Sequence, residues 1–152
     1  SRYSAACPPS GTKLLVDTST RELSLCDQGK LQRRYPVALG RGGVDKQQQG
    51  DGRTPLGEYP LLWGRPSAEF HTFLHVGYPT AEERARGLTG GDIGVHGPGR
   101  SFRFLGALST LSNWTAGCIA VASDAQIDEI AAWVRIHDAR TILIIAGAAT
   151  RK

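Results

Sequence analysis

Apolar and polar positions alternate through the first forty residues, and this period of two predicts a β-meander. In the second expected strand Leu23 and Leu25 share one face, and Gly29 lies in a turn where positive φ is favoured. Residues 1–11 carry two prolines and small polar side chains, which predicts an extended lead-in. The three expected strands cover residues 13–18, 21–26 and 31–39.

The middle of the chain predicts short strands between glycine-rich loops. Residues 40–52 hold five glycines and few apolar side chains, so we expect a flexible surface loop that cannot bury itself. Further strands are expected at 58–63 and 70–76, whereas 81–86 favours a helical turn at most. Residues 100–112 fit no element pattern and form a long connection, a kind of segment that often carries binding function.

The last part of the chain predicts one helix between two strands. The apolar run 118–122 predicts the first strand, and the β-branched run 141–146 predicts a fully buried one. Between them Ser123 is a favourable N-cap, and Gln126 completes a capping box. The buried stripe of this helix is expected to consist of Ile127, Ile130, Ala131 and Val134. The pattern therefore predicts a mainly β (α+β) protein with one main helix.

Composition indicates one folded domain over residues 1–152. Hydrophobic residues make up 40% of the chain and charged residues 21%, which is ordinary for a protein that buries a core. The net charge of +4 comes from scattered Lys and Arg, so we expect no nucleic-acid partner. No apolar stretch approaches the length of a membrane span, so no stable membrane insertion is expected. Because Met is absent, we expect the sequence to start after a removed leader or at the edge of a cloned segment.

Three cysteines leave two arrangements open. Cys7 and Cys26 can pair and leave Cys118 free, which would tie the lead-in to the first hairpin and indicate an oxidising compartment. The alternative is three unpaired thiols, with Cys26 acting as a small apolar strand residue. Both stay open because the sequence does not show how close the two Cα atoms come.

Cys118 and His96 are the candidate nucleophile and base. Cys118 follows Gly117 at the start of an apolar run, where a turn would hold the sulfur at the surface. His96 ends another short strand and precedes Gly97, so we expect the two side chains to meet in space. A thiol is mostly protonated near neutrality, and the imidazole would take its proton. Backbone N–H groups of 116–118, that of Cys118 first, are candidate oxyanion donors.

Other patterns indicate no metal and no cofactor. His71 and His75 lie four residues apart on an expected strand, and no further Cys or carboxylate cluster completes a metal shell. The glycine-rich stretches 40–43 and 90–91 do not open a helix after a strand, so phosphate binding is not expected. For the cysteine and the histidine themselves, the alternative is a buried structural thiol and a hydrogen-bonded core imidazole.

Four pieces of the sequence, taken in order, resemble the L,D-transpeptidase catalytic domain, also called the YkuD domain. They are KLLVDTSTRELSLCDQGKLQRRYPVALG, DGRTPLGEYPLL, FLHVGYPTAEERARG…GGDIGVHG and WTAGCIAVASDAQIDEI. The resemblance covers nearly the whole chain and is closest to the periplasmic branch of the family. It implies a β-sandwich with one main helix after the strand of the catalytic cysteine, in a protein exported to the periplasm or cell envelope.

The resemblance also implies roles for single residues. Cys118 is similar to the family's nucleophile, and His96 to its general base and later acid. Thr115 matches the Ser/Thr before the Gly117–Cys118 pair and is expected to hydrogen-bond the imidazole or the substrate. The backbone of Gly97 is expected to orient the ring.

Two positions depart from the pattern of many family members. Ala116 stands where many have His, and Ala120 stands where many have Arg, which removes a bidentate contact to a carboxylate or peptide carbonyl. Arg100 and Arg103 are then candidates for anchoring the substrate, with solvated loop charges as the alternative. Trp114, beside the cysteine, is a candidate for a wall of the substrate pocket.

The implied reaction is ping-pong acyl transfer on peptidoglycan stem peptides through a Cys118 thioester. The acceptor that resolves the thioester decides the activity: with an acceptor amine the protein is a transpeptidase, and with a D-amino acid it is an exchange enzyme. Water gives an L,D-carboxypeptidase or a hydrolase that detaches a wall-linked protein. A non-catalytic peptidoglycan-binding module is the alternative from another class, and it would not need the pair with His96. An unrelated cytosolic thiol enzyme would require Cys7 and Cys26 to be reduced.

Overall fold

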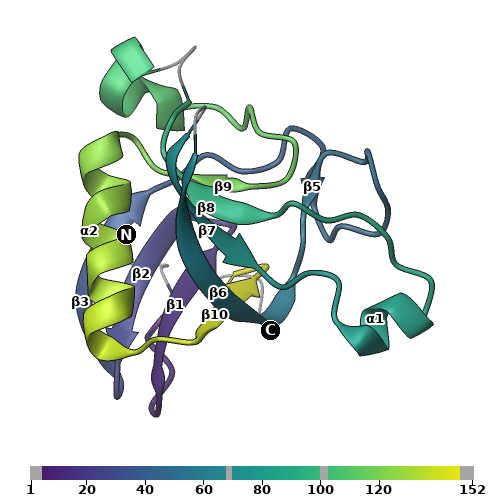
Figure 1. Ribbon diagram of the computed structural model, residues 1–152, viewed down its shortest axis with the longest axis horizontal. Helices are drawn as coiled ribbons and strands as arrows, with labels where there is room; N and C mark the ends of the chain where they lie inside the picture. The colour runs from purple at the N-terminus through teal and green to yellow at the C-terminus, as the bar shows by residue number, and fades with distance from the viewer. Residues whose placement is uncertain (1–4, 68–69, 100–102, 148–152) are drawn as a thin grey trace.

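The chain folds around one mixed β-sheet. The structure, a computed structural model, describes residues 5–67, 70–99 and 103–147. The sheet strands are β1 (Thr12–Asp17), β2 (Glu22–Asp27), β3 (Lys30–Pro36), β6 (Gly57–Ser67), β7 (His71–Val76), β8 (Gly94–His96), β9 (Ile119–Ala120) and β10 (Thr141–Ile145). They are ordered β3-β2-β1-β10-β6-β7-β8-β9, and Figure 1 shows how the sheet twists through the molecule.

The sheet folds over on itself into a sandwich. β6 is long enough to pair with β10 through its first residues and with β7 through its last, so it belongs to both leaves. Beyond β3, Ala38 and Ala120 exchange backbone hydrogen bonds of 2.8 and 2.9 Å, which brings the two ends of the sheet together. The mainly β fold with one main helix is therefore confirmed.

The helix α2 (Asp124–His137) covers one side of the sheet and packs against β7 and β8 (Figure 1). Ser123 caps it as expected, because its hydroxyl accepts a hydrogen bond from the N–H of Gln126. The Gln126 side chain accepts from the N–H of Ala122, and not from that of Ser123 as a capping box requires. The buried residues are Ile127, Ile130 and Trp133, whereas Ala131 and Val134 are only partly buried. The helix thus contacts the core along a stripe turned slightly from the predicted one.

The opposite face of β1 and β10 is covered by the lead-in. A disulfide joins Cys7 to Cys26 with the Cα atoms 5.5 Å apart, so the structure selects the paired alternative and leaves Cys118 free. Ile142 and Ile144 face the main core, but Leu143, on the lead-in side, is only half-buried. The expectation of a fully buried strand was wrong for that face, because a short segment covers it instead of a helix or a second sheet.

Residues 40–52 form a mostly exposed surface segment, as expected, but internal contacts hold it together. β4 (Gly43–Val44) pairs with β5 (Arg53–Thr54), and Lys46, only 4% exposed, makes an ion pair of 3.0 Å with Asp51. Burial alone would raise the pKa of Asp51, but hydrogen bonds from neighbouring backbone N–H groups and from Lys46 hold it far below its usual range. Polar contacts thus hold this segment together where apolar side chains are scarce.

The remaining elements project from the sheet. α1 (Ala81–Ala85) is the expected helical turn, capped by Thr80, and η1 (Arg103–Thr110) is a 3₁₀ segment in the long connection that precedes β9. In Figure 1 they lie on opposite sides of the molecule. Among the described residues, no helix is long and apolar enough to cross a membrane.

Candidate active site

The candidate site is a hollow of about 620 Å³ at the end of the sheet where β8 and β9 run side by side. These strands are parallel, with His96 in register with Ala120, and Cys118 comes directly before β9. His96 and Cys118 both line the hollow, His96 being 1% exposed and Cys118 partly exposed. Two segments twenty-two residues apart in the sequence therefore bring a thiol and an imidazole to one pocket.

The loop before Cys118 is held by Thr115. Its hydroxyl donates to the carbonyl oxygen of Cys118 at 2.7 Å and accepts from the N–H of Gly117 at 3.0 Å. Thr115 is only 3% exposed, and both contacts of its hydroxyl brace the loop, although the residue also lines the pocket. The hydrogen bond expected from it to the imidazole or the substrate stays a prediction. Because the N–H of Gly117 donates to Thr115, it is not free to serve as an oxyanion donor. Among the described residues no hydrogen bond engages the N–H of Cys118, which remains the candidate oxyanion donor.

Neighbouring segments fix this loop from two sides. The N–H of Thr115 donates to the carbonyl oxygen of Leu39, and the N–H of Arg41 donates to that of Thr115, at 3.1 and 2.8 Å. The indole N–H of Trp114 donates to the carbonyl oxygen of Ser109 at 2.9 Å, which ties the loop to η1. The thiol therefore sits on a backbone that is anchored before the chain enters β9.

His96 is held in a defined tautomer. Its Nδ1 lies 2.6 Å from the carbonyl oxygen of Gly97. Because a carbonyl oxygen only accepts hydrogen bonds, Nδ1 carries the proton in the neutral ring and Nε2 keeps its lone pair. Burial lowers the pKa of His96 to about 4, and the contact with Gly97 opposes this only in part. The imidazole is therefore neutral at neutral pH and able to accept a proton at Nε2.

Aromatic rings surround this imidazole. Phe70 stacks on it with ring centroids 3.8 Å apart, and the centroids of Phe73 and Trp114 lie at 5.9 and 6.1 Å. All three rings line the pocket. The sequence indicates Trp114 for this place, whereas it assigns Phe70 and Phe73 only to a strand. It offers no further signal for them, because aromatic residues at a strand are as common in a core as at a site.

The thiol of Cys118 is protonated at rest. Its Sγ donates to the carbonyl oxygen of Asp92 at 3.3 Å. Burial raises its pKa to about 11. The N–H of Gly94 opposes this shift, the charge of Asp92 adds to it, and the charge of Lys46 opposes it again. A neutral thiol in the same pocket as a neutral imidazole suits proton transfer during attack, and not a resting thiolate–imidazolium pair.

The arginines of the pocket differ from those expected. Arg41 and Arg65 line it, and both are exposed. Arg100 lies outside the described residues, and so does the side chain of Arg103, although its backbone belongs to η1. Arg41 follows a glycine in a polar segment and Arg65 lies on a strand, so neither stands out in the sequence.

The sandwich and its pocket define a mainly β domain with a cysteine–histidine site. The family model described as the L,D-transpeptidase catalytic domain, YkuD, matches residues 11–145. The chain belongs to this family.

Individual relatives agree with this assignment. The putative L,D-transpeptidase YafK of Escherichia coli K12 is 31% identical over 74 residues, which is 47% of this chain and 30% of that protein. The helical cell shape determining protein Pgp2 of Campylobacter jejuni matches with a TM-score of 0.68 and 21% identity, over 94% of this chain and 50% of that one. Bd1075 of Bdellovibrio bacteriovorus matches with a TM-score of 0.64 and 22% identity, over 95% and 52%. The chain covers only part of each relative, and the structural matches bear on the fold.

Proposed function

We propose that this protein is a cysteine-dependent L,D-acyltransferase of peptidoglycan stem peptides, with Cys118 as nucleophile and His96 as general base and acid. The observation that carries the proposal is the shared pocket, which is lined by a partly exposed thiol and by a buried imidazole whose Nδ1 is already engaged. Membership of the L,D-transpeptidase family supplies the substrate class.

The first half-reaction forms a thioester. Nε2 of His96 takes the proton of Cys118 as the sulfur attacks the carbonyl carbon between the L-centre of the stem diamino acid and the terminal D-residue. The N–H of Cys118 donates a hydrogen bond to the oxyanion that develops. When the tetrahedral intermediate collapses, the C–N bond breaks and the amine of the D-residue leaves with the proton from His96.

The second half-reaction returns the enzyme to its resting state. His96 removes a proton from the acceptor, which attacks the thioester carbon and displaces the sulfur, and the sulfur recovers its proton from His96. An amine acceptor gives a cross-link, a D-amino acid gives exchange, and water gives carboxypeptidase activity or release of a wall-linked protein. The residues that act are the same in all these cases.

Location in the periplasm or cell envelope is part of the proposal. The Cys7–Cys26 disulfide supports it, because disulfides persist mainly in oxidising compartments. A peptidoglycan substrate would require the same location.

The test is a digest of stem tetrapeptides, with and without an added D-amino acid, read by mass spectrometry. We expect loss or exchange of the terminal D-residue with the parent protein and none with Cys118→Ala. For His96→Asn we expect a rate about 10²–10⁴-fold lower, since this is the usual contribution of a general base. Asn can keep an N–H donor near the Gly97 carbonyl oxygen, so that variant probes the lost base with little change in packing.

Two outcomes would contradict the proposal. Turnover that persists in Cys118→Ala would exclude the thiol as nucleophile. No turnover by the parent on any stem, combined with retention on isolated peptidoglycan by both the parent and Cys118→Ala, would favour the non-catalytic binding module.

A further inference from the structure

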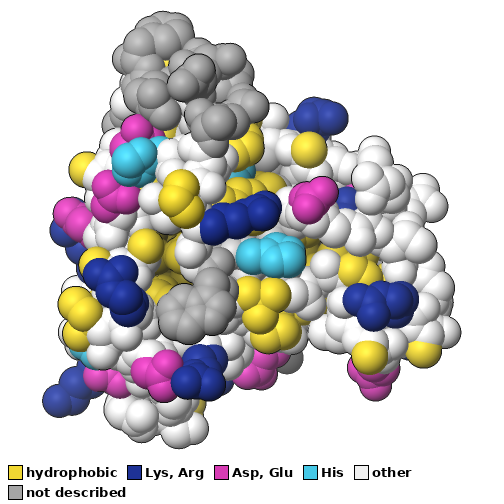
Figure 2. Space-filling model, in the orientation of Figure 1, with side chains coloured by type: hydrophobic (Ala, Val, Ile, Leu, Met, Phe, Trp, Pro, Cys, Tyr) yellow, Lys and Arg dark blue, Asp and Glu magenta, His cyan; other side chains and the backbone are white. Residues whose placement is uncertain are grey.

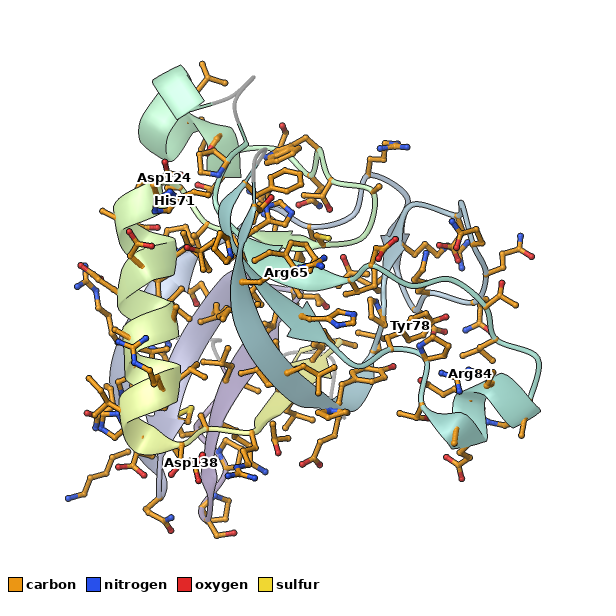
Figure 3. The ribbon with its side chains drawn as sticks, viewed as in Figure 1. Arg65, His71, Tyr78, Arg84, Asp124 and Asp138 are labelled. Atoms are coloured by element: carbon orange, nitrogen blue, oxygen red, sulfur yellow. A yellow bond between two sulfur atoms is a disulfide. The ribbon has the colours of Figure 1, made fainter. Side chains whose placement is uncertain are left out.

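Two arginines flank the candidate site on opposite sides. The sheet order runs β6-β7-β8-β9, and the segment around Gly40 lies beyond β9, where it bridges to Thr115. Arg65 is on β6 and Arg41 follows Gly40, so His96 on β8 and the cysteine before β9 lie between them. Arg65 lies at the centre of the face drawn in Figure 3, and Figure 2 shows a basic side chain exposed at that place.

Each arginine is held by a contact with the site. The backbone N–H of Arg41 donates to the carbonyl oxygen of Thr115 at 2.8 Å, so Arg41 is attached to the loop of the nucleophile. The guanidinium of Arg65 lies 5.3 Å from the ring centroid of Phe73, a cation–π contact, and Phe73 is in turn one of the rings around His96. Both residues therefore start from anchored positions, and both are exposed.

The guanidinium groups are available to a ligand. Neither forms an ion pair with a carboxylate of the described residues, and Asp92 is the only acidic residue among the described residues that line the pocket. β7, β8 and β9 lie between β6, which carries Arg65, and the segment around Gly40, so the two arginines reach the pocket from different sides with the reacting groups in between. Such an arrangement suits two carboxylates on one ligand better than a single carboxylate held twice.

We propose that Arg41 and Arg65 are specificity-determining residues, and that they bind two different free carboxylates of the stem peptide on opposite sides of the attacked carbonyl. One is the terminal carboxylate of the leaving D-residue, and the other is a carboxylate on the donor side, such as that of the diamino-acid side chain. This inference rests on the proposed function and adds which ends of the substrate the pocket recognises.

The experiment uses three stem tetrapeptides that contain diaminopimelate. One has all carboxylates free, one is amidated at the terminal D-residue, and one is amidated at the diaminopimelate side chain. In the parent protein we expect each amidation to lower kcat/KM by about tenfold, since each removes one charge-assisted contact. Arg41→Gln should abolish the penalty at one carboxylate and keep the other penalty, and Arg65→Gln should do the reverse.

Two further variants separate the loss of a specific arginine contact from the loss of any exposed positive charge. Arg86→Gln removes an equally exposed arginine at the end of α1, away from the pocket, and should keep both penalties. Arg65→Lys should restore part of the discrimination, because it keeps the charge but not the bidentate geometry. If the penalties are unchanged in both glutamine variants, or if one arginine accounts for both, the inference is overturned.

A binding measurement separates this inference from the proposed function. The same three peptides are titrated calorimetrically into Cys118→Ala, alone and combined with each arginine variant. Suppose that the parent turns over no peptide, but that amidation still weakens binding in an arginine-dependent way. The proposed acyl transfer is then contradicted, whereas recognition of the carboxylates by the arginines is supported. If amidation leaves Kd unchanged, the recognition fails whatever the turnover.

Discussion

His96 owes its chemical state to its surroundings. With a pKa lowered from 6.5 to about 4 by burial, the ring stays neutral and basic at Nε2 wherever the pH is above that value. The thiol, with a pKa raised to about 11, stays protonated at any pH below that value. In the proposed reaction, attack then requires transfer of a proton from Cys118 to His96.

This state predicts the pH dependence of the reaction. We expect kcat/KM to rise as His96 loses its proton near pH 4 and then to stay level through neutral pH. The profile should be measured on a stem peptide, with circular dichroism at each acidic pH to show that the protein is folded. An acidic limb centred near the ordinary histidine value of 6.5 would contradict the proposed environment of His96.

We expect Phe70 to act as a positioning residue in this environment. Its ring stacks on His96 at 3.8 Å and shields one face of the imidazole from water. Phe70→Leu should admit water, raise the pKa of His96 from about 4 toward 6.5 and move the acidic limb of kcat/KM upward. Phe70→Trp, which keeps an aromatic cover, serves as the control. An NMR titration of His96 that does not differ between these two variants would exclude this role.

At the scale of elements, the loop that carries Cys118 depends on one glycine. Gly117 has φ +133°, and a Cβ added there would lie 2.7 Å from the carbonyl oxygen of Arg53. Gly117→Ala should lower the free energy of unfolding by more than about 1 kcal/mol and lower kcat/KM, because the backbone before Cys118 must shift. Urea unfolding and kinetics check both effects.

The control for this change is a glycine with a similar backbone and open space. Gly87 has φ +92° and no atom within 4 Å of the position that a Cβ would take, so Gly87→Ala carries the backbone strain without the collision. It should cost some stability and leave kcat/KM unchanged. Full activity in Gly117→Ala would show that the loop does not need this close approach.

The lead-in is a second element with a measurable contribution. The Cys7–Cys26 disulfide spans a sequence separation of 19 residues and holds Ala5 and Cys7 over the outer face of β1 and β10. Replacing both cysteines by alanine should lower the free energy of unfolding by about 3 kcal/mol, through the larger entropy of the unfolded chain. Urea unfolding of this variant and of the parent measures the loss, and kcat/KM should not change because the lead-in lies away from the pocket. Equal stability would mean that the covalent link adds nothing to the packing.

At the scale of the whole molecule, the sheet joins the beginning of the chain to its end. β1 pairs in parallel with β10, from Leu14 with Ile142 to Asp17 with Ile145, and all the site strands hydrogen-bond into the same sheet. The single domain over residues 1–152 remains a prediction, and it requires one cooperative unfolding transition. Circular dichroism and tryptophan fluorescence should give coincident urea curves, whereas two separate transitions would contradict it.

The features that could be predicted from the residue pattern alone are local. The alternation around Leu23 and Leu25, the cap at Ser123 and the helical spacing of Ile127 and Ile130 predicted their elements, because period and capping depend on residues a few positions apart. Cys118 also stood out locally, through its glycine and the strand that follows. Family resemblance then supplied the mainly β sandwich that the structure has.

Contacts between distant segments became visible only in the folded chain. The pairing of Ala38 with Ala120, the rings around His96 and the burial of Lys46 all depend on strand register across the sheet. The same is true of the shifted pKa values of the site, since desolvation depends on everything packed around a group. The sequence pattern records which face of a strand is apolar, but not which strand lies beside it. The position of Arg65 next to the pocket therefore emerged from the fold alone.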